Sequence, residues 1–206
     1  MRGRLATSIA AALLLSVTLI PLSAQMPPPP FIMTAFVVNM TNVSIPRGNA
    51  GTLQIRINSF SPDGTRQRLI QTMVEKGQNA LLKALQKEPS RGRISFPAWQ
   101  GPDPQNYRLG WDLRYVAHTQ LPDGGDRLVI ATDRQMSMWE VQNQPRTVDY
   151  PFTLFEIHIP KEGKGEGRGF GATQIKFDKK KNQIELEQYS AGDLRLNEIT
   201  IEAKKK

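Results

Sequence analysis

The stretch FTLFEIHIPKEGKGEGRGFG, residues 152–171, joins an apolar segment to a series of alternating glycines. Residues 152–159 carry apolar side chains on both faces of an extended chain, which is typical of a central strand with both faces covered. From residue 163 to residue 171 glycine occupies every second position, so one face of a strand here would have no side chains. We expect either a flexible hairpin or a bare strand face against which the helix or an aromatic side chain packs.

The helical pattern of this chain lies between residues 66 and 88 and ends at Pro89. Its apolar residues fall within one arc of about 160° on a helical wheel, which indicates a helix with one side laid on a sheet. Small residues, Gly77, Ala80 and Ala84, occupy the middle of that arc. We expect them to let the helix axis approach the sheet closely.

Strand patterns occupy most of the remaining chain after residue 30. They cover residues 31–38, 52–58, 93–96, 107–119, 127–132, 183–189 and 194–201. In one of them Trp111, Leu113 and Tyr115 are expected to share a face, and Pro-Asp-Gly-Gly at 122–125 predicts a hairpin turn. The resulting fold class is α+β, a largely antiparallel curved sheet or sandwich with one amphipathic helix packed on it.

The N-terminus has the layout of a secretory signal peptide. Arg2 and Arg4 precede an apolar stretch at residues 9–20, and small residues around Ala24 offer a cleavage site. We therefore expect an exported, periplasmic or extracellular, bacterial protein. The expected organisation is a signal peptide at 1–24, a Pro-rich tether at 25–30, a single α+β domain at 31–203 and a basic tail at 204–206.

Composition narrows the possible partners. The chain has no cysteine, which excludes disulfides, thiolate zinc sites and a lipid-bearing cysteine. Its formal charge is +8, and residues 47–114 hold 11 basic against 5 acidic residues. We expect no nucleic acid partner for an exported protein. An anionic surface or an acidic protein is the partner that the basic helix region would favour, and no oligomeric state is indicated.

Few residues offer chemistry. Glu156 and His158 stand two positions apart on one strand face and are the candidate site residues, either as a binding or acid/base pair or as a structural pair. The glycine series matches neither nucleotide-binding motif, and no G-x-S-x-G sequence is present. We expect no catalytic residues, no metal site and no cofactor.

The functional expectation is an exported, non-catalytic binding or scaffold module. One alternative is a carrier of an apolar or amphiphilic ligand, in which the curved sheet and the helix enclose a cavity. The other is a carboxylate-dependent hydrolase, because such enzymes carry no short sequence motif.

Overall fold

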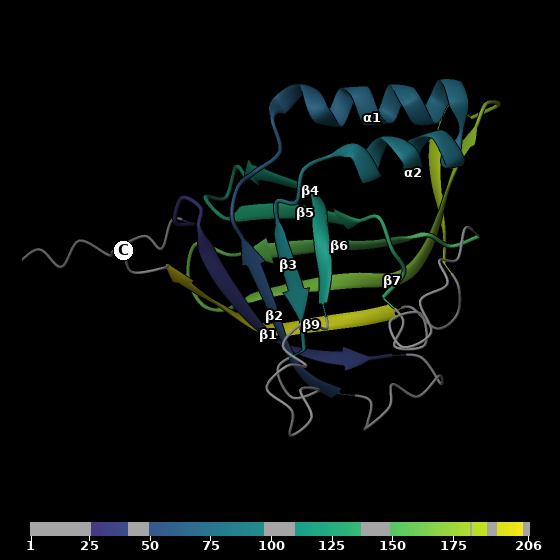
Figure 1. Cartoon of the computed structure of the whole chain (residues 1–206). Helices are drawn as coiled ribbons and strands as arrows, with labels where there is room; N and C mark the ends of the chain where they lie inside the picture. Colours follow the sequence, from purple (N-terminus) through teal and green to yellow (C-terminus); the bar gives the residue numbers. More distant parts are fainter. Residues whose placement is uncertain are drawn as a thin grey trace, which may run out of the picture.

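In the computed structural model, antiparallel strands close into a barrel and two helices lie across one side of it (Figure 1). The structure describes residues 26–40, 50–96, 110–136, 149–181, 183–188 and 193–203. The predicted signal peptide at residues 1–24 and the basic tail at 204–206 lie outside the described residues. Neither described helix has the length and hydropathy of a membrane-spanning segment.

The helices are α1 (Asp63–Lys76) and α2 (Gln78–Lys87). The strands are β1 (Phe31–Asn39), β2 (Ala50–Ile57), β3 (Gly92–Ser95), β4 (Gly110–Gln120), β5 (Asp126–Thr132), β6 (Phe152–Ile159), β7 (Gly165–Asp178), β8 (Gln183–Gln188) and β9 (Asp193–Ala203). Each expected strand is present in the described residues, while residues 107–109 and 189 of the predicted ranges lie outside them.

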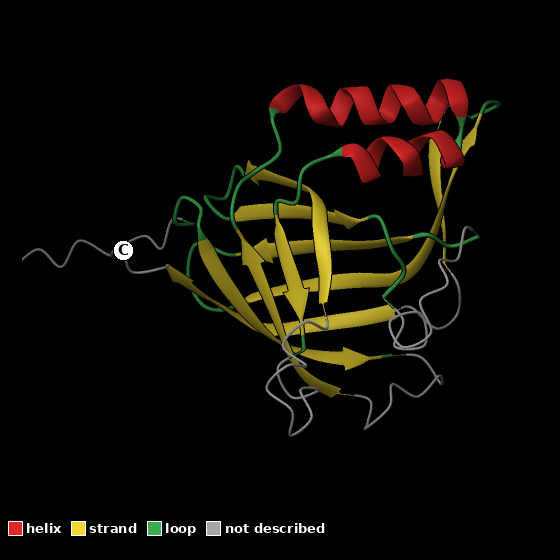
Figure 2. Cartoon of the chain, viewed as in Figure 1, coloured by secondary structure: helices red, strands yellow, loops and turns green. Residues whose placement is uncertain are grey.

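The arrangement of the strands differs from the prediction. The sheet order is β6-β5-β4-β3-β2-β1-β9-β7-β8, and a further pairing of β6 with β7 closes eight of the strands into a barrel. The predicted curved sheet or sandwich with one packed helix is wrong, because β6 and β7 each pair on both sides and remove the open edges (Figure 2). The ninth strand, β8, pairs with the second half of β7 and extends as a ribbon beyond the barrel.

The barrel interior is a packed core. Along the barrel strands inward-pointing side chains alternate with outward-pointing ones, except where β7 carries glycine, and an eight-stranded barrel is just wide enough for such side chains to fill it. The largest of the fully buried side chains are Phe31, Phe152, Phe155, Met33, Leu53, Ile55, Ile57, Ile94, Leu113, Leu128, Ile130 and Ile157. All but Phe152 belong to the core cluster inside the barrel.

The alternating glycines form the inner face of β7. Gly167 and Gly169 lie opposite Ile157 and Phe155 of β6, and on the other side they face bulky residues of β9. A side chain at Gly169 would collide with the ring of Phe155. The expectation of a bare strand face covered by an aromatic residue is confirmed, and it is this face that makes room for the core.

The prediction for this face is that Gly169→Val destabilises the protein by about 1–3 kcal/mol, because it overpacks a filled interior. Urea unfolding followed by circular dichroism measures this. Gly51→Val is the matched control, since a side chain at Gly51 in β2 has nothing within 4 Å among the described residues. Equal stability of the two variants would contradict the account of β7.

The single helix predicted between residues 66 and 88 is wrong. The backbone of Gly77 has φ 77° and ψ −176°, a conformation restricted in practice to glycine, and it separates α1 from α2. Gly77 was expected to allow close packing, yet a side chain there would have no neighbour within 4 Å among the described residues. Its role is to break the helix and turn the chain.

We predict that Gly77→Ala costs about 1–3 kcal/mol of stability, because alanine is strained in this backbone conformation. Gly64→Ala, inside α1 and with open space at its Cβ position, is expected to stabilise the protein by up to about 1 kcal/mol. Thermal or urea unfolding of the pair checks the opposite signs. A Gly77→Ala variant as stable as the parent would mean that the break does not require glycine.

The segment before β1 contacts one end of the barrel. Met26 packs against the core, and its backbone N–H donates a hydrogen bond of 3.2 Å to Asp126 Oδ2. The other carboxylate oxygen of Asp126 lies 2.7 Å from His118 Nε2, and Phe60 stacks on that imidazole with ring centroids 5.2 Å apart. His118 therefore belongs to a structural cluster.

Candidate ligand-binding site

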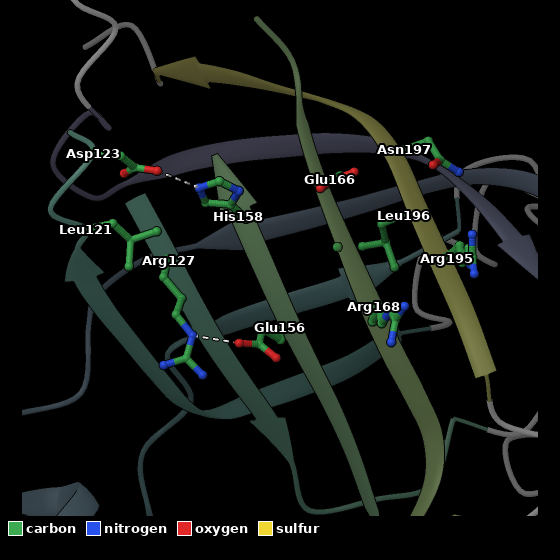
Figure 3. Close-up of a pocket in the computed structure, with 11 residues that line it drawn as sticks. Leu121, Asp123, Arg127, Glu156, His158, Glu166, Arg168, Arg195, Leu196 and Asn197 are labelled. Atoms are coloured by element: carbon green, nitrogen blue, oxygen red, sulfur yellow. Dashed lines mark hydrogen bonds and ion pairs between the residues drawn. The ribbon is translucent and has the colours of Figure 1, made fainter. Parts of the chain in front are cut away.

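The two predicted site residues, Glu156 and His158, line an open polar basin on the outside of the barrel (Figure 3). Both project outward from β6 because Phe155, Ile157 and Ile159 occupy the inward positions. The basin has a volume of about 460 Å³. The strands β7 and β9 contribute Arg168 and Arg195 to its lining.

Each of the two residues has a partner other than its neighbour. Glu156 Oε1 accepts a hydrogen bond of 2.7 Å from Arg127 Nε on β5, and both side chains are about half exposed. His158 Nε2 lies 3.9 Å from Asp123 Oδ2, which is beyond hydrogen-bond length. No hydrogen bond or ion pair joins Glu156 to His158, although both are described. A role for these residues in binding stays a prediction.

A second and more apolar site lies between the helices and the barrel wall, and we call it the helix–barrel groove. It has a volume of about 550 Å³. Its lining residues are Arg66, Leu69, Ile70, Met73, Leu81, Leu85, Tyr115, Ala117, Thr119, Arg127, Val129, Ala131, Phe152, Leu154, Ile175 and Leu186. The helices form one side of the groove, the outer faces of β4, β5 and β6 form the other, and the ribbon of β7 and β8 adds the last two residues.

Tyr115 enters the groove because of an irregularity in β4. Leu113 pairs with Thr132 and Tyr115 pairs with Ala131, so Arg114 is an extra residue in this strand. The expected common face of Trp111, Leu113 and Tyr115 is therefore wrong. Trp111 and Leu113 lie inside the barrel, whereas Tyr115 lies among the residues beneath the helices.

The Tyr115 side chain brings a hydroxyl group into a mainly apolar part of the wall. Burial raises the pKa of this hydroxyl above its ordinary value, and the positive charge of Arg66 offsets part of that shift. The hydroxyl therefore stays protonated at neutral pH and is a potential hydrogen-bond donor. No hydrogen bond joins it to another described residue.

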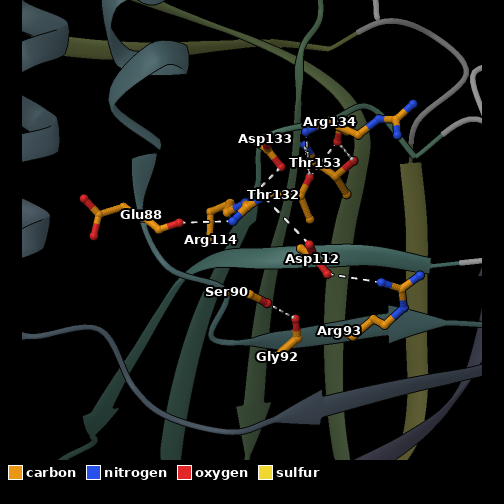
Figure 4. Close-up of polar contacts among 10 residues, drawn as sticks. All are labelled: Glu88, Ser90, Gly92, Arg93, Asp112, Arg114, Thr132, Asp133, Arg134 and Thr153. Atoms are coloured by element: carbon orange, nitrogen blue, oxygen red, sulfur yellow. Dashed lines mark hydrogen bonds and ion pairs between the residues drawn. The ribbon is translucent and has the colours of Figure 1, made fainter. Parts of the chain in front are cut away.

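Glu88 and Arg114 anchor the end of α2 to the barrel (Figure 4). Arg114 Nη1 donates a hydrogen bond of 3.1 Å to the Glu88 backbone oxygen, and its Nε lies 3.4 Å from the buried carboxylate of Asp133. The Glu88 carboxylate accepts a hydrogen bond of 2.7 Å from Arg68 of α1. The extra residue of β4 thus ties both helices to the strand.

Two further contacts hold the helices at other points. Before α1, the Ser61 backbone N–H donates to the Val116 backbone oxygen at 2.8 Å, and the Val116 N–H donates to Ser61 Oγ at 3.0 Å. At the turn between the helices, Gln78 Oε1 accepts a hydrogen bond of 2.8 Å from the Ile175 backbone N–H. The helix pair is fixed at its two ends and at its turn, and the groove lies beneath the part in between.

The prediction for the anchor is that Arg114→Gln destabilises the protein by about 2–3 kcal/mol, because it removes the cation beside the buried Asp133 carboxylate and the hydrogen bond to the Glu88 backbone oxygen. Arg93→Gln is the control, since the Arg93 ion pair with Asp112 is exposed and is worth about 1 kcal/mol or less. Urea unfolding compares the two variants. An equally small loss of unfolding free energy in both variants would contradict the anchoring role of Arg114.

The described part of the chain offers no candidate metal site. No three His, Asp or Glu side chains converge there as a metal site would require. No family model, curated protein or solved structure matches the chain. The geometry of the two outer-wall sites therefore carries the functional argument.

Proposed function

We propose that this protein is an exported carrier that holds the apolar part of a small amphiphilic ligand in the helix–barrel groove. The observation that carries the proposal is the groove itself, whose lining is mainly aliphatic and aromatic. Its volume of about 550 Å³ falls within the range of about 300–1,000 Å³ that is usual for small-molecule sites. Export is supported by the signal-peptide pattern of residues 1–24.

The groove is the favoured binding place because the barrel interior is occupied by side chains. Residues such as Phe31, Met33 and Ile55 are fully buried there. In the groove, by contrast, small residues such as Ala117 and Ala131 form part of the wall and leave room opposite the helices. An apolar chain placed against them would bury surface that water now contacts, which favours binding.

The hydrolase alternative has less support. Its candidate carboxylate, Glu156, is ion-paired with Arg127 and stands on an open outer surface. Acid/base catalysis needs a carboxylate and a partner placed together around the reacting atoms. In the described structure the nearest charged partners of Glu156 and His158 come from different segments, namely β5 and the turn that precedes it.

A groove-filling substitution tests the carrier proposal. Ala117→Trp places a large side chain in the groove, whereas Thr34→Trp, on the outer face of β1, is a matched change away from it. The neutral dye phenylnaphthylamine emits strongly in apolar surroundings. We expect its emission to rise with the parent protein and with Thr34→Trp, and to stay low with Ala117→Trp. Circular dichroism checks that both variants are folded.

Displacement of the dye by straight-chain alcohols refines the same test. Each added CH₂ group is expected to contribute about 0.8 kcal/mol, or about fourfold in affinity, until the groove is full. Hexanol, octanol and decanol supply the series. Failure of the parent protein to bind either the dye or any alcohol would overturn the proposal, as would full binding by Ala117→Trp.

A further inference from the structure

We propose that the ligand of the helix–barrel groove carries an anionic head group, a carboxylate or a phosphate, which binds at the end of the groove formed by Arg66, Thr119 and Arg127. This inference rests on the proposed carrier function and adds the chemistry and the orientation of the ligand. Three observations carry it: where the polar lining residues lie, which charges they bear, and what lines the rest of the groove.

The polar lining residues gather at one end. Thr119 of β4 and Arg127 of β5 are directly paired across the two strands. The hydrogen bonds between Ser61 and Val116 place the start of α1 beside the same part of β4. Arg66 lies in the first turns of α1. Its positive charge offsets part of the rise that burial causes in the pKa of Tyr115, which lines the groove on β4 together with Ala117 and Thr119.

Both charged residues that line the groove in the described structure are arginines, and none of the described acidic residues lines it. Arg66 is exposed and forms no ion pair with any described residue. Arg127 lines both the groove and the polar basin, and in the basin it forms an ion pair with Glu156 (Figure 3). A carboxylate or phosphate matches the donor geometry of a guanidinium group, so an anionic head complements this end.

The opposite end of the groove is apolar. Phe152 of β6, Ile175 of β7 and Leu186 of β8 line it, and they lie at the side of the barrel where the ribbon extends. A charged group buried there would lose its hydration without a partner. The geometry therefore orients the ligand with its chain toward the ribbon and its head toward the start of α1.

Four ligands of equal chain length test the head group by isothermal titration calorimetry at neutral pH, below their micelle-forming concentrations. Decanoate and decyl phosphate are expected to bind at least about fivefold more tightly than decanol, and decyltrimethylammonium more weakly than decanol. The difference between decanoate and decanol should shrink with added salt. The comparison of decanoate with decyl phosphate identifies which anion the site prefers.

Variants assign the effect to this end of the groove. Arg66→Gln is expected to weaken decanoate binding about fivefold and to leave decanol binding unchanged, while Lys83→Gln, an exposed change outside the groove, alters neither. Glu156→Gln releases Arg127 from its ion pair and is expected to strengthen decanoate binding about twofold or more. These opposite signs would not arise from a general loss of structure.

The outcomes separate the two proposals. Equal affinities for decanoate and decanol, with no effect of Arg66→Gln, would overturn the anionic head group and leave the carrier function standing. Binding of decyltrimethylammonium as tight as that of decanoate would do the same. If none of the four ligands binds, the carrier function itself falls.

Discussion

The structure depends on the first half of β7, whose inner face carries glycine in place of larger side chains. Bulky residues from β6 and β9 point toward this strand from both sides, and the barrel closes because Gly165, Gly167 and Gly169 leave them room. Larger side chains at these glycine positions would collide with their neighbours and overfill an interior that is already packed. Closure in turn removes the open edges of β6 and β7, which an unclosed sheet would expose.

Because side chains fill the barrel interior, a ligand would have to bind on the outer wall. The shape of this wall beneath the helices depends on a local irregularity in β4. The extra residue Arg114 turns Tyr115 outward and uses its own side chain to hold the end of α2. The glycine at position 77 breaks the helix so that its two halves form a pair lying over the wall. Because the pair is attached at its ends and at its turn, an apolar groove persists beneath it.

Strand positions follow closely from sequence alternation, and β6 begins and ends where the pattern predicts. Closure was not predictable in the same way, because alternation shows that a strand has two faces but does not show which distant strand pairs with it. The glycine series was the available signal, since it indicates a bare face that bulky neighbours must cover. The single-helix prediction failed because apolar periodicity continues across Gly77, while the break depends on the backbone angles of one residue.

In the two outer-wall sites, too, some features follow from the local sequence pattern and others depend on distant segments. The common outward face of Glu156 and His158 follows from the two-residue period of a strand, but their partners Arg127 and Asp123 depend on strand register. The face of Tyr115 was predicted wrongly, because one inserted residue moves every later side chain of β4 to the opposite face without disturbing the pattern before it. The groove requires the placement of segments far apart in sequence, which no local pattern contains.

Methyl NMR of the protein titrated with decanol would show where a bound apolar chain lies. If decanol occupies the helix–barrel groove, the methyl signals of Met73, Leu81 and Val129 shift and show contacts to the ligand, while those of Met33 and Ile55 inside the barrel do not. Ligand contacts to the interior methyl groups, or no contacts to the groove, would contradict binding in the groove.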